Sequence, residues 1–244
     1  DALLRTTSYT YDKLNRQTGV KDALNNQTTY TYDPFGNQTQ ITDALGRSTH
    51  YIYDELNRVK QVTDALGGVT TNTYDAVGNQ LSLTDPLNRT TNYTYDELNR
   101  NTSVIDPLGH TTTNNYDAVS NLITTTDALS RQTKYTYDAL KRRTVVTNPD
   151  NTTVTTNYDK VGNVVGVTDE LGRTTSYTYD DRNLLSSVID PLLNKTTTNY
   201  DAVGNVVGVI DPNGNTTSYS YDPLARKIAE VDALGYATSY QYDG

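Results

Sequence analysis

A Tyr-Asp pair recurs every 21 residues along the whole of this 244-residue chain. The tyrosines of these pairs are Tyr11, Tyr32, Tyr53, Tyr74, Tyr95, Tyr116, Tyr137, Tyr158, Tyr179, Tyr200, Tyr221 and Tyr242. No insertion interrupts the spacing, and a fixed period of this length is typical of repeat proteins, in which each repeat packs only against its neighbours. We therefore expect residues 1–244 to form one continuous array of eleven full repeats and a partial twelfth. The start at Asp1 in mid-pattern, without a Met, indicates a piece of a longer chain.

Each repeat is predicted to be a β-hairpin. In the first repeat, residues 7–12 and 17–21 alternate in the way that strands do, and Thr7, Tyr9 and Tyr11 share a face. A turn at residues 13–16, which we call the Tyr-Asp turn, joins them, and a second turn at residues 22–26 leads to the next repeat. Residues that tolerate positive φ recur in both turns, and this register favours hairpins over a disordered polar repeat. They are Asn15, Gly36, Asn57, Gly78, Asn99, Gly162 and Gly204 in the Tyr-Asp turns and Gly46, Gly67, Gly109 and Gly172 in the second turns.

A second period, two repeats long, overlies the first. Odd repeats carry Leu-Asn-Arg in the Tyr-Asp turn, as at residues 14–16, whereas even repeats carry Val-Gly-Asn, as at residues 77–79. This alternation indicates different environments for odd and even hairpins, and one arrangement that provides them is two facing sheets, in which each layer is a pair of repeats. Inward-facing residues would then be the fixed tyrosines together with Val20, Ile41, Val62, Leu83 and Val104. The alternative is duplication of a two-repeat segment without structural meaning.

Composition limits the class of protein. Hydrophobic residues make up 34 % of the chain, below the roughly 45 % of ordinary globular domains. The net charge of −9 argues against a nucleic-acid surface. The sequence lacks Cys, so disulfides and thiolate metal sites are excluded, and its apolar runs are too short to span a membrane. The expected fold class is all-β: tandem hairpins in an extended solenoid-like or spiralling sheet.

The recurrent signature, as in residues 43–58 (DALGRSTHYIYDELNR), resembles the YD repeats of the Rhs family, which also occur in teneurins and Tc toxin complexes. The likeness covers the whole chain. It implies hairpins that join into a long sheet, which spirals into a hollow shell that encloses a toxin or presents an extracellular surface. A secreted or surface-associated structural protein is thereby implied.

Two features depart from that family pattern. The plug-like region, autoproteolytic site and toxin domain of Rhs shells are not visible, and residues 240–244 are ordinary repeat. Shell repeats also vary in length, whereas these do not. Unbroken spacing favours a uniform fibre or open solenoid over a closed shell.

Aspartate occupies two fixed places in the repeat. One follows the fixed tyrosine and the other opens the second turn, and Asn148 replaces the second once. A row of Ca²⁺ sites is one interpretation, but Asp also accepts hydrogen bonds from turn N–H groups, and Asn can do the same, so we favour turn capping. The turn-capping residues named on this basis are Asp12, Asp33, Asp54, Asp75, Asp96 and Asp117. Residues 211–222 have EF-hand-like spacing, but Thr216 stands where that loop needs Gly, so we expect no metal or cofactor.

Nothing in the pattern singles out a catalytic centre. His50 and His110 occupy different places in their repeats, so neither a zinc site nor a Ser-His-Asp triad is supported. Paired carboxylates for glycoside hydrolysis would need one acid in an apolar pocket, and the aspartates are equivalent. We expect the protein not to be an enzyme.

The fixed tyrosines are expected to pack as a structural ladder, with exposed rings that bind carbohydrate as the alternative. Asn-x-Ser/Thr sequons provide acceptor sites for glycans if the protein meets the glycosylation machinery. These sequons begin at Asn26, Asn37, Asn88, Asn92, Asn101, Asn151, Asn194 and Asn215.

The function expected from the sequence is therefore structural: a segment of an extracellular or cell-surface β-repeat fibre. A wall segment of an Rhs/Tc-type shell that encapsulates a toxin is the first alternative, and a glycan-binding adhesin is the second. The expected partners are copies or continuations of the same array, with glycans or an enclosed toxin domain as further partners. Nucleic acid and a membrane span are not expected.

Overall fold

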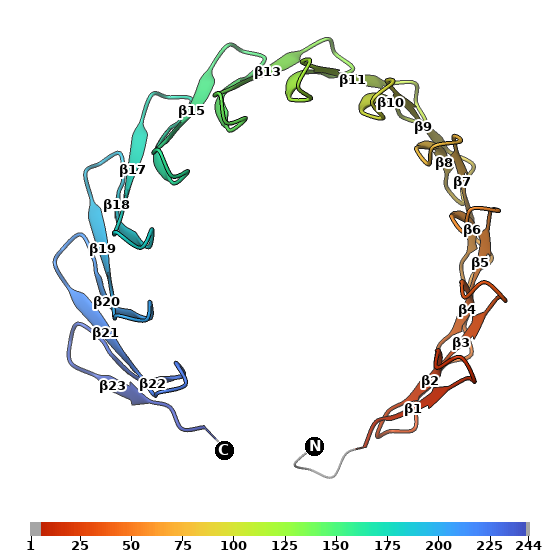
Figure 1. Cartoon of the computed structure of the whole chain (residues 1–244), viewed down its shortest axis with the longest axis horizontal. Helices are drawn as coiled ribbons and strands as arrows, with labels where there is room; N and C mark the ends of the chain where they lie inside the picture. Colours follow the sequence, from red (N-terminus) through yellow and green to blue (C-terminus); the bar gives the residue numbers. More distant parts are fainter. Residues whose placement is uncertain (1–5, 243–244) are drawn as a thin grey trace. The chain divides into compact units, whose positions relative to one another are not determined.

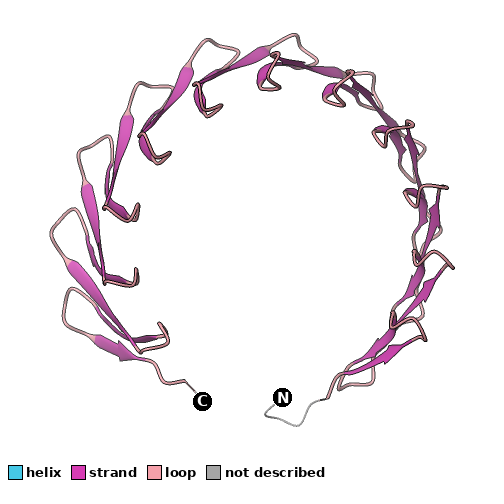
Figure 2. Ribbon diagram, in the orientation of Figure 1, coloured by secondary structure: helices cyan, strands magenta, loops and turns pink. Residues whose placement is uncertain are grey.

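The computed structural model describes residues 6–242, and all regular elements among them are β-strands (Figure 2). Within this range no helix could cross a membrane. The all-β prediction is confirmed. Asp1 and Asp243, which the repeat pattern places at turn positions, lie outside the described residues. The chain divides into two compact units: unit 1 comprises Asp1–Asn115 and Thr126–Ser130, and unit 2 comprises Tyr116–Thr125 and Arg131–Gly244.

Each repeat contributes one strand of about six residues and one of five. The strands of unit 1 are β1 (Ser8–Tyr11), β2 (Gln17–Lys21), β3 (Gln27–Tyr32), β4 (Gln38–Thr42), β5 (Ser48–Tyr53), β6 (Val59–Thr63), β7 (Val69–Tyr74), β8 (Gln80–Thr84), β9 (Thr90–Tyr95) and β10 (Asn101–Ile105). Strands β11 (Thr111–Tyr116) and β12 (Leu122–Thr126) contribute residues to both units.

The strands of unit 2 follow the same plan. They are β13 (Gln132–Tyr137), β14 (Arg143–Thr147), β15 (Thr153–Tyr158), β16 (Val164–Thr168), β17 (Thr174–Tyr179), β18 (Leu185–Ile189), β19 (Lys195–Tyr200), β20 (Val206–Ile210), β21 (Thr216–Tyr221), β22 (Lys227–Val231) and β23 (Ala237–Ser239).

Within each unit, every strand pairs antiparallel with the next strand along the chain (Figure 1). This holds from β1 to β10 in unit 1 and from β13 to β23 in unit 2. Odd and even hairpins therefore alternate in one sheet. The arrangement with odd repeats in one sheet and even repeats in a facing sheet is wrong, because the second turn is short enough to pair successive hairpins directly.

The turns explain this direct pairing. In the first Tyr-Asp turn, the Asn15 N–H donates to the Asp12 carbonyl and the Asp12 N–H donates to the Arg16 carbonyl. Asn15 has a φ of 61°. This is the three-residue hairpin loop, a type I turn followed by a left-handed residue, whose twist suits adjacent antiparallel strands. Every Tyr-Asp turn and every second turn among the described residues has positive φ at this fourth position.

The Gly and Asn positions named from the sequence all have positive φ, so that prediction is confirmed. Several residue types that rarely adopt positive φ also have it at this position. They are Ser120, Ser130, Lys141, Leu193 and Ala225. The repeat therefore imposes the backbone conformation even where the residue disfavours it.

The two faces of the sheet differ. Tyr9 lies opposite Val20, which lies opposite Thr28. On the other face, Thr10 lies opposite Gly19. The same arrangement recurs along each unit: the fixed tyrosines and residues such as Val62 share one face, whereas the other face carries mostly Thr, Ser, Gly and Gln.

No hydrophobic side chain among the described residues is buried. The expected inward-facing residues do share one face, but within each unit that face is half-buried and is covered by no second sheet. Backbone ladders and contacts between neighbouring repeats must therefore supply most of the stability.

Because successive strands run in opposite directions, the Tyr-Asp turns of a unit lie along one edge of its sheet and the second turns lie along the other. The third residue of most turns is an exposed aliphatic side chain on either edge. Leu14 is 70 % exposed on the Tyr-Asp edge, and Leu66 is 95 % exposed on the second edge. Each edge thus carries a row of apolar side chains.

Candidate functional site: the edge formed by the Tyr-Asp turns

The aspartate of each Tyr-Asp turn accepts backbone hydrogen bonds. Asp12 Oδ1 accepts the N–H groups of Leu14 and Arg16, at 2.9 and 3.0 Å, and Oδ2 accepts the Arg16 Nε–H at 2.7 Å. Asp33 and Asp54 accept the same two backbone N–H groups within their own turns. So do Asp75, Asp96 and Asp117. These carboxylates therefore satisfy turn N–H groups that no strand partner reaches.

These hydrogen bonds favour the charged form of the carboxyl groups. The backbone N–H of Arg16 is the main reason why the pKa of Asp12 lies below its ordinary value, and it acts against partial desolvation. In the second turn, the Arg47 side chain lowers the pKa of Asp43 most strongly, followed by the Arg47 backbone N–H. The carboxylates are thus held ionised by donors from their own turn.

The second turn beginning at Asn148 is built differently. Asn148 Nδ2 donates to Thr152 Oγ1 at 3.1 Å, and Asp150 Oδ1 accepts the Thr152 N–H at 3.0 Å. The expectation that Asn148 takes over the role of the aspartate is therefore wrong. Asp150, two residues further along, provides the acceptor instead.

The hydroxyl groups of nine fixed tyrosines reach back to the preceding hairpin. Tyr32 donates to the Gln17 carbonyl at 2.7 Å, and Tyr53 donates to the Gln38 carbonyl at 2.8 Å. The same bond, to the residue 15 positions earlier, is made by Tyr74, Tyr137, Tyr158, Tyr179, Tyr200, Tyr221 and Tyr242. In the hairpins that lie wholly within one unit, a β-bulge follows the accepting residue; in the first, Tyr11 lies opposite Gln17 and Thr10 lies opposite Gly19. The tyrosine thus satisfies a carbonyl beside an irregularity of the ladder.

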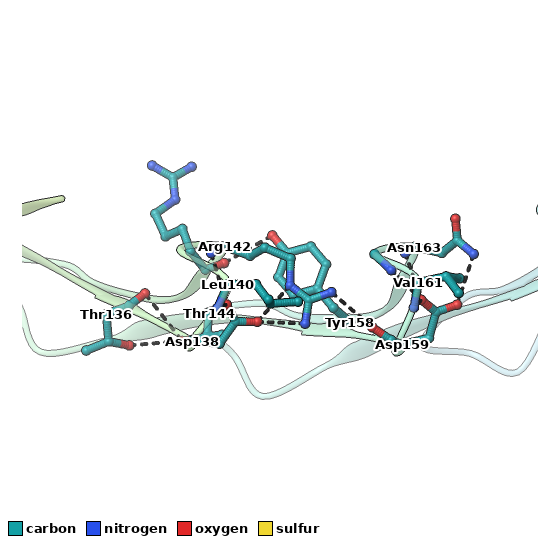
Figure 3. A network of polar contacts seen from close by, with 11 residues as sticks. Thr136, Asp138, Leu140, Arg142, Thr144, Tyr158, Asp159, Val161 and Asn163 are labelled. Carbon is teal, nitrogen blue, oxygen red and sulfur yellow. Dashed lines mark hydrogen bonds and ion pairs between the residues drawn. The ribbon is translucent and has the colours of Figure 1, made fainter. Parts of the chain in front are cut away.

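Within each unit, arginines of odd Tyr-Asp turns make links to the following even turn (Figure 3). Arg142 Nε donates to Asp138 Oδ2 at 2.7 Å, and its Nη1 donates to the Asp159 carbonyl at 2.9 Å. Its guanidinium carbon lies 4.5 Å from the centre of the Tyr158 ring. Arg16 and Arg58 make the same contacts with the turns that follow them in unit 1. One side chain therefore combines an ion pair, a hydrogen bond and a cation–π contact.

At three junctions among the described residues, an asparagine links an even turn to the following odd turn. Asn37 Nδ2 donates to Asp33 Oδ2 at 2.9 Å and to Asn57 Oδ1 at 2.6 Å. Asn79 and Asn163 reach the next repeat in the same way. The alternation between odd and even repeats hence has a structural basis: two kinds of link alternate along one sheet edge.

The ninth repeat carries its arginine two positions earlier than the other odd repeats, and Leu184 occupies the usual place. Arg182 Nη2 nevertheless lies 2.9 Å from Asp180 Oδ2, and its Nη1 donates to the Asp201 carbonyl at 2.6 Å. Both polar contacts of the arginine link are therefore made from the displaced position. Sequence reasoning missed this exchange, although the reversed order of Arg and Leu was visible.

No group of acidic and histidine side chains that could hold a metal ion occurs within residues 6–242. His50 lies in β5 on the polar face, and His110 Nδ1 lies 2.9 Å from Asp106 Oδ2 within one turn. Asp211, the first residue of the EF-hand-like segment, accepts N–H groups from Asn213 and Asn215.

The sequon asparagines differ in their contacts. The amide nitrogens of Asn26, Asn37, Asn194 and Asn215 each donate to the aspartate of their own turn. Asn101 Nδ2 contacts two backbone carbonyls. Asn88 and Asn151 have positive φ in exposed turns, and Asn92 lies exposed in β9. Because a glycan is attached to the amide nitrogen, only these last three present it without an existing hydrogen bond among the described residues.

The model of the RHS repeat family matches six overlapping or successive windows: residues 11–47, 32–69, 74–111, 116–153, 158–192 and 200–227. The chain belongs to the RHS repeat family. The array described above, with its Tyr-Asp turns, fixed tyrosines and alternating links, is therefore an RHS repeat array. The predicted family is confirmed.

Three solved structures share the fold. They are "Crystal Structure of TcdB2-TccC3-Cdc42" (TM-score 0.57, 17 % identity), "Crystal Structure of TcdB2-TccC3" (0.56, 18 %) and the Photorhabdus luminescens Tc holotoxin pore with the mutation TccC3-D651A (0.56, 17 %). Each match covers 93 % of this chain but only 15–16 % of the other chain. At this identity the likeness establishes the fold of the RHS array. Comparison with curated protein sequences gives no significant match.

Proposed function

We propose that this RHS array is a wall segment of a shell of the Rhs/Tc type, secreted or located at the cell surface, which encloses another polypeptide such as a toxin domain. Residues 1–244 would act as one continuous stretch of that wall. The observation that carries the proposal is the single-layer sheet of each unit, in which no described hydrophobic side chain is buried. A sheet without a core of its own is suited to separating two compartments.

The unlike faces of the sheet support this role. Tyr51 lies opposite Val62 on one face, whereas Gln40 lies opposite His50 on the other. A wall meets a different environment on each side, and this difference is built into every strand by the period-2 alternation.

The exposed side chains at the turns also support the wall function. Leu45, Leu66 and Leu87 are 77, 95 and 70 % exposed along the second-turn edge of unit 1. In a shell made from a long strip, neighbouring parts of the strip would cover these side chains and remove apolar surface from water.

Imaging of the full-length parent protein by electron microscopy tests the proposal. A closed particle whose interior polypeptide resists added protease is expected. Leu66→Lys combined with Leu87→Lys should open the particle, because these exposed side chains contribute to edge contacts rather than to the hairpins. The matched control, Thr10→Ser on the polar face, should leave it closed. Long uniform filaments would contradict the wall proposal.

The uniform fibre remains a second candidate, supported by the unbroken 21-residue spacing. In that case the same images would show filaments whose length is independent of any enclosed polypeptide, and added protease would find no protected fragment.

A further inference from the structure

A groove of about 510 Å³ lies at the Tyr-Asp edge of unit 1, between the turns of the second and third repeats. Phe35, Tyr51 and Tyr53 line it together with Asp33 and Glu55. A similar groove of about 490 Å³ lies in unit 2, and its lining residues occupy the equivalent positions four repeats further along the chain. Both grooves occur where an even turn meets an odd turn.

At the odd-to-even junctions, the equivalent place holds a guanidinium group. Arg58 lies 4.6 Å from the Tyr74 ring centre, donates to Asp54 Oδ2 at 2.7 Å, and donates to the Asp75 carbonyl at 2.8 Å. These junctions show how the fold binds a guanidinium group: a ring face, a carboxylate and a carbonyl oxygen surround one planar cation.

The groove in unit 1 offers the same elements without the arginine. Asn37 stands at the position of Arg58, but its short side chain bonds only to Asp33 and Asn57. Tyr53 supplies the ring, and no side chain among the described residues donates to the Asp54 carbonyl.

In the groove of unit 2, the chain supplies a cation from another position. Lys141 lines this groove and donates from Nζ to the Val119 carbonyl at 2.9 Å. It stands where Asn57 stands in unit 1. Desolvation raises the pKa of Asp117, but hydrogen bonds from Asn121 and then the charge of Lys141 lower it below its ordinary value. The groove of unit 2 therefore contains a positive charge, the Lys141 ammonium group.

The charges around the unit 1 groove favour a cation. Glu55 makes no ion pair among the described residues, and the groove contains no basic residue. Burial is the main cause of the raised pKa of Tyr53, and the negative charge of Asp33 adds to it. Phe35 is 84 % exposed and forms an apolar side of the groove.

We propose that this groove binds the guanidinium group of an arginine side chain from a partner protein. The guanidinium lies against the Tyr53 ring and donates to the Asp54 carbonyl, as Arg58 does at the Tyr74 ring and the Asp75 carbonyl, and it also donates to the Glu55 carboxylate. A planar cation with several donors fits this set better than a compact ammonium. The inference goes beyond the wall function and does not depend on it.

The proposal is tested by NMR on the 244-residue chain with labelled tyrosine rings, and the Tyr53 signals are assigned as those lost in Tyr53→Phe. The probes are N-acetyl-arginine amide and its neutral isostere N-acetyl-citrulline amide at equal ionic strength. The arginine probe should shift the Tyr53 signals in a saturable way, and the citrulline probe should not.

Reciprocal variants sharpen the test. Asn37→Arg should place an internal guanidinium over Tyr53 and abolish the response there. Arg58→Asn should uncover Tyr74 and create a response at that ring. Should Asn37→Arg fail to fold, the exposed Glu55→Gln variant should weaken binding about threefold. An equal response of all tyrosines, an equal response to citrulline, or an unchanged Tyr53 response in both Asn37→Arg and Glu55→Gln would overturn the proposal.

Discussion

The hydroxyl group of Tyr53 donates a hydrogen bond across the repeat boundary to the carbonyl of Gln38, 2.8 Å away, whereas the hydroxyl of neighbouring Tyr51 makes no hydrogen bond among the described residues. The two rings lie on the same face of β5. Their difference separates the role of the fixed tyrosine from that of the alternating one.

Tyr53→Phe should therefore lower the free energy of unfolding by about 1 kcal/mol, because a partly buried carbonyl loses its partner. Tyr51→Phe is the control and should change it little. Urea unfolding of both variants measures the difference, and equal effects would show that the hydroxyl bond does not matter.

The displaced arginine of the ninth repeat gives a second prediction. Arg182→Leu removes the link to Asp201 and should lower the urea midpoint, by less than Tyr53→Phe, because Arg182 is 43 % exposed and solvent screens its ion pair. The double exchange Arg182→Leu with Leu184→Arg restores the usual order of an odd repeat and should recover the midpoint. No recovery in the double variant would contradict the equivalence of the two positions.

Leu193 has a φ of 67° and is 82 % exposed, so its side chain contributes strain and little packing. Leu193→Gly should raise the free energy of unfolding by about 0.5 kcal/mol, since relief of roughly 1–2 kcal/mol of left-handed strain exceeds the entropy penalty of Gly. Leu192, equally exposed but without positive φ, is the matched control. Leu192→Gly should lower stability by roughly 0.5–1 kcal/mol, and a loss in both variants would refute the strain argument.

Stability should fall in acid. Hydrogen bonds from their own turns lower the pKa of most Tyr-Asp aspartates below the ordinary 3.8, and the folded state therefore binds fewer protons than the unfolded state in this range. This contribution is complete above about pH 5 and is lost as the pH falls through 3.8 and below the folded pKa values. Melting temperatures between pH 6 and pH 2 should show this decline.

Adjacent aspartates provide the control for the acid prediction. Asp180 accepts the N–H groups of Arg182 and Leu184, and the Leu184 bond is the main cause of its lowered pKa. The side chain of Asp181 makes no hydrogen bond among the described residues. Asp180→Asn should flatten the acid decline slightly, whereas Asp181→Asn should not. Identical profiles would mean that the caps do not carry the pH dependence.

The sequence predicted the hairpins because local rules act within each repeat: period-2 strands, and a turn whose fourth residue is Gly or Asn. It predicted the wrong arrangement for odd and even hairpins. The alternation between Arg, as at Arg16, and Asn, as at Asn37, indicates only that odd and even turns have different environments. Whether the difference lies between two sheets or along one edge depends on contacts between neighbouring repeats, such as that of Arg16 with the Asp33 carbonyl, which no single repeat contains. The displaced Arg182 and the Asp150 acceptor were missed for a related reason. A side chain can reach the same oxygen or N–H group from another position of the turn.

The alternation of arginine and asparagine links also sets the step in which such an array can grow or shrink. Removing one repeat would bring Arg16 beside the turn that contains Arg58 and leave the Asn57 amide without the Asn37 donor. Removing the third and fourth repeats together would again bring an even turn that carries Asn37 beside an odd turn that carries an asparagine, Asn99. Gain or loss of a repeat pair therefore keeps odd and even turns in alternation. Gain or loss of a single repeat instead brings two turns of the same kind side by side.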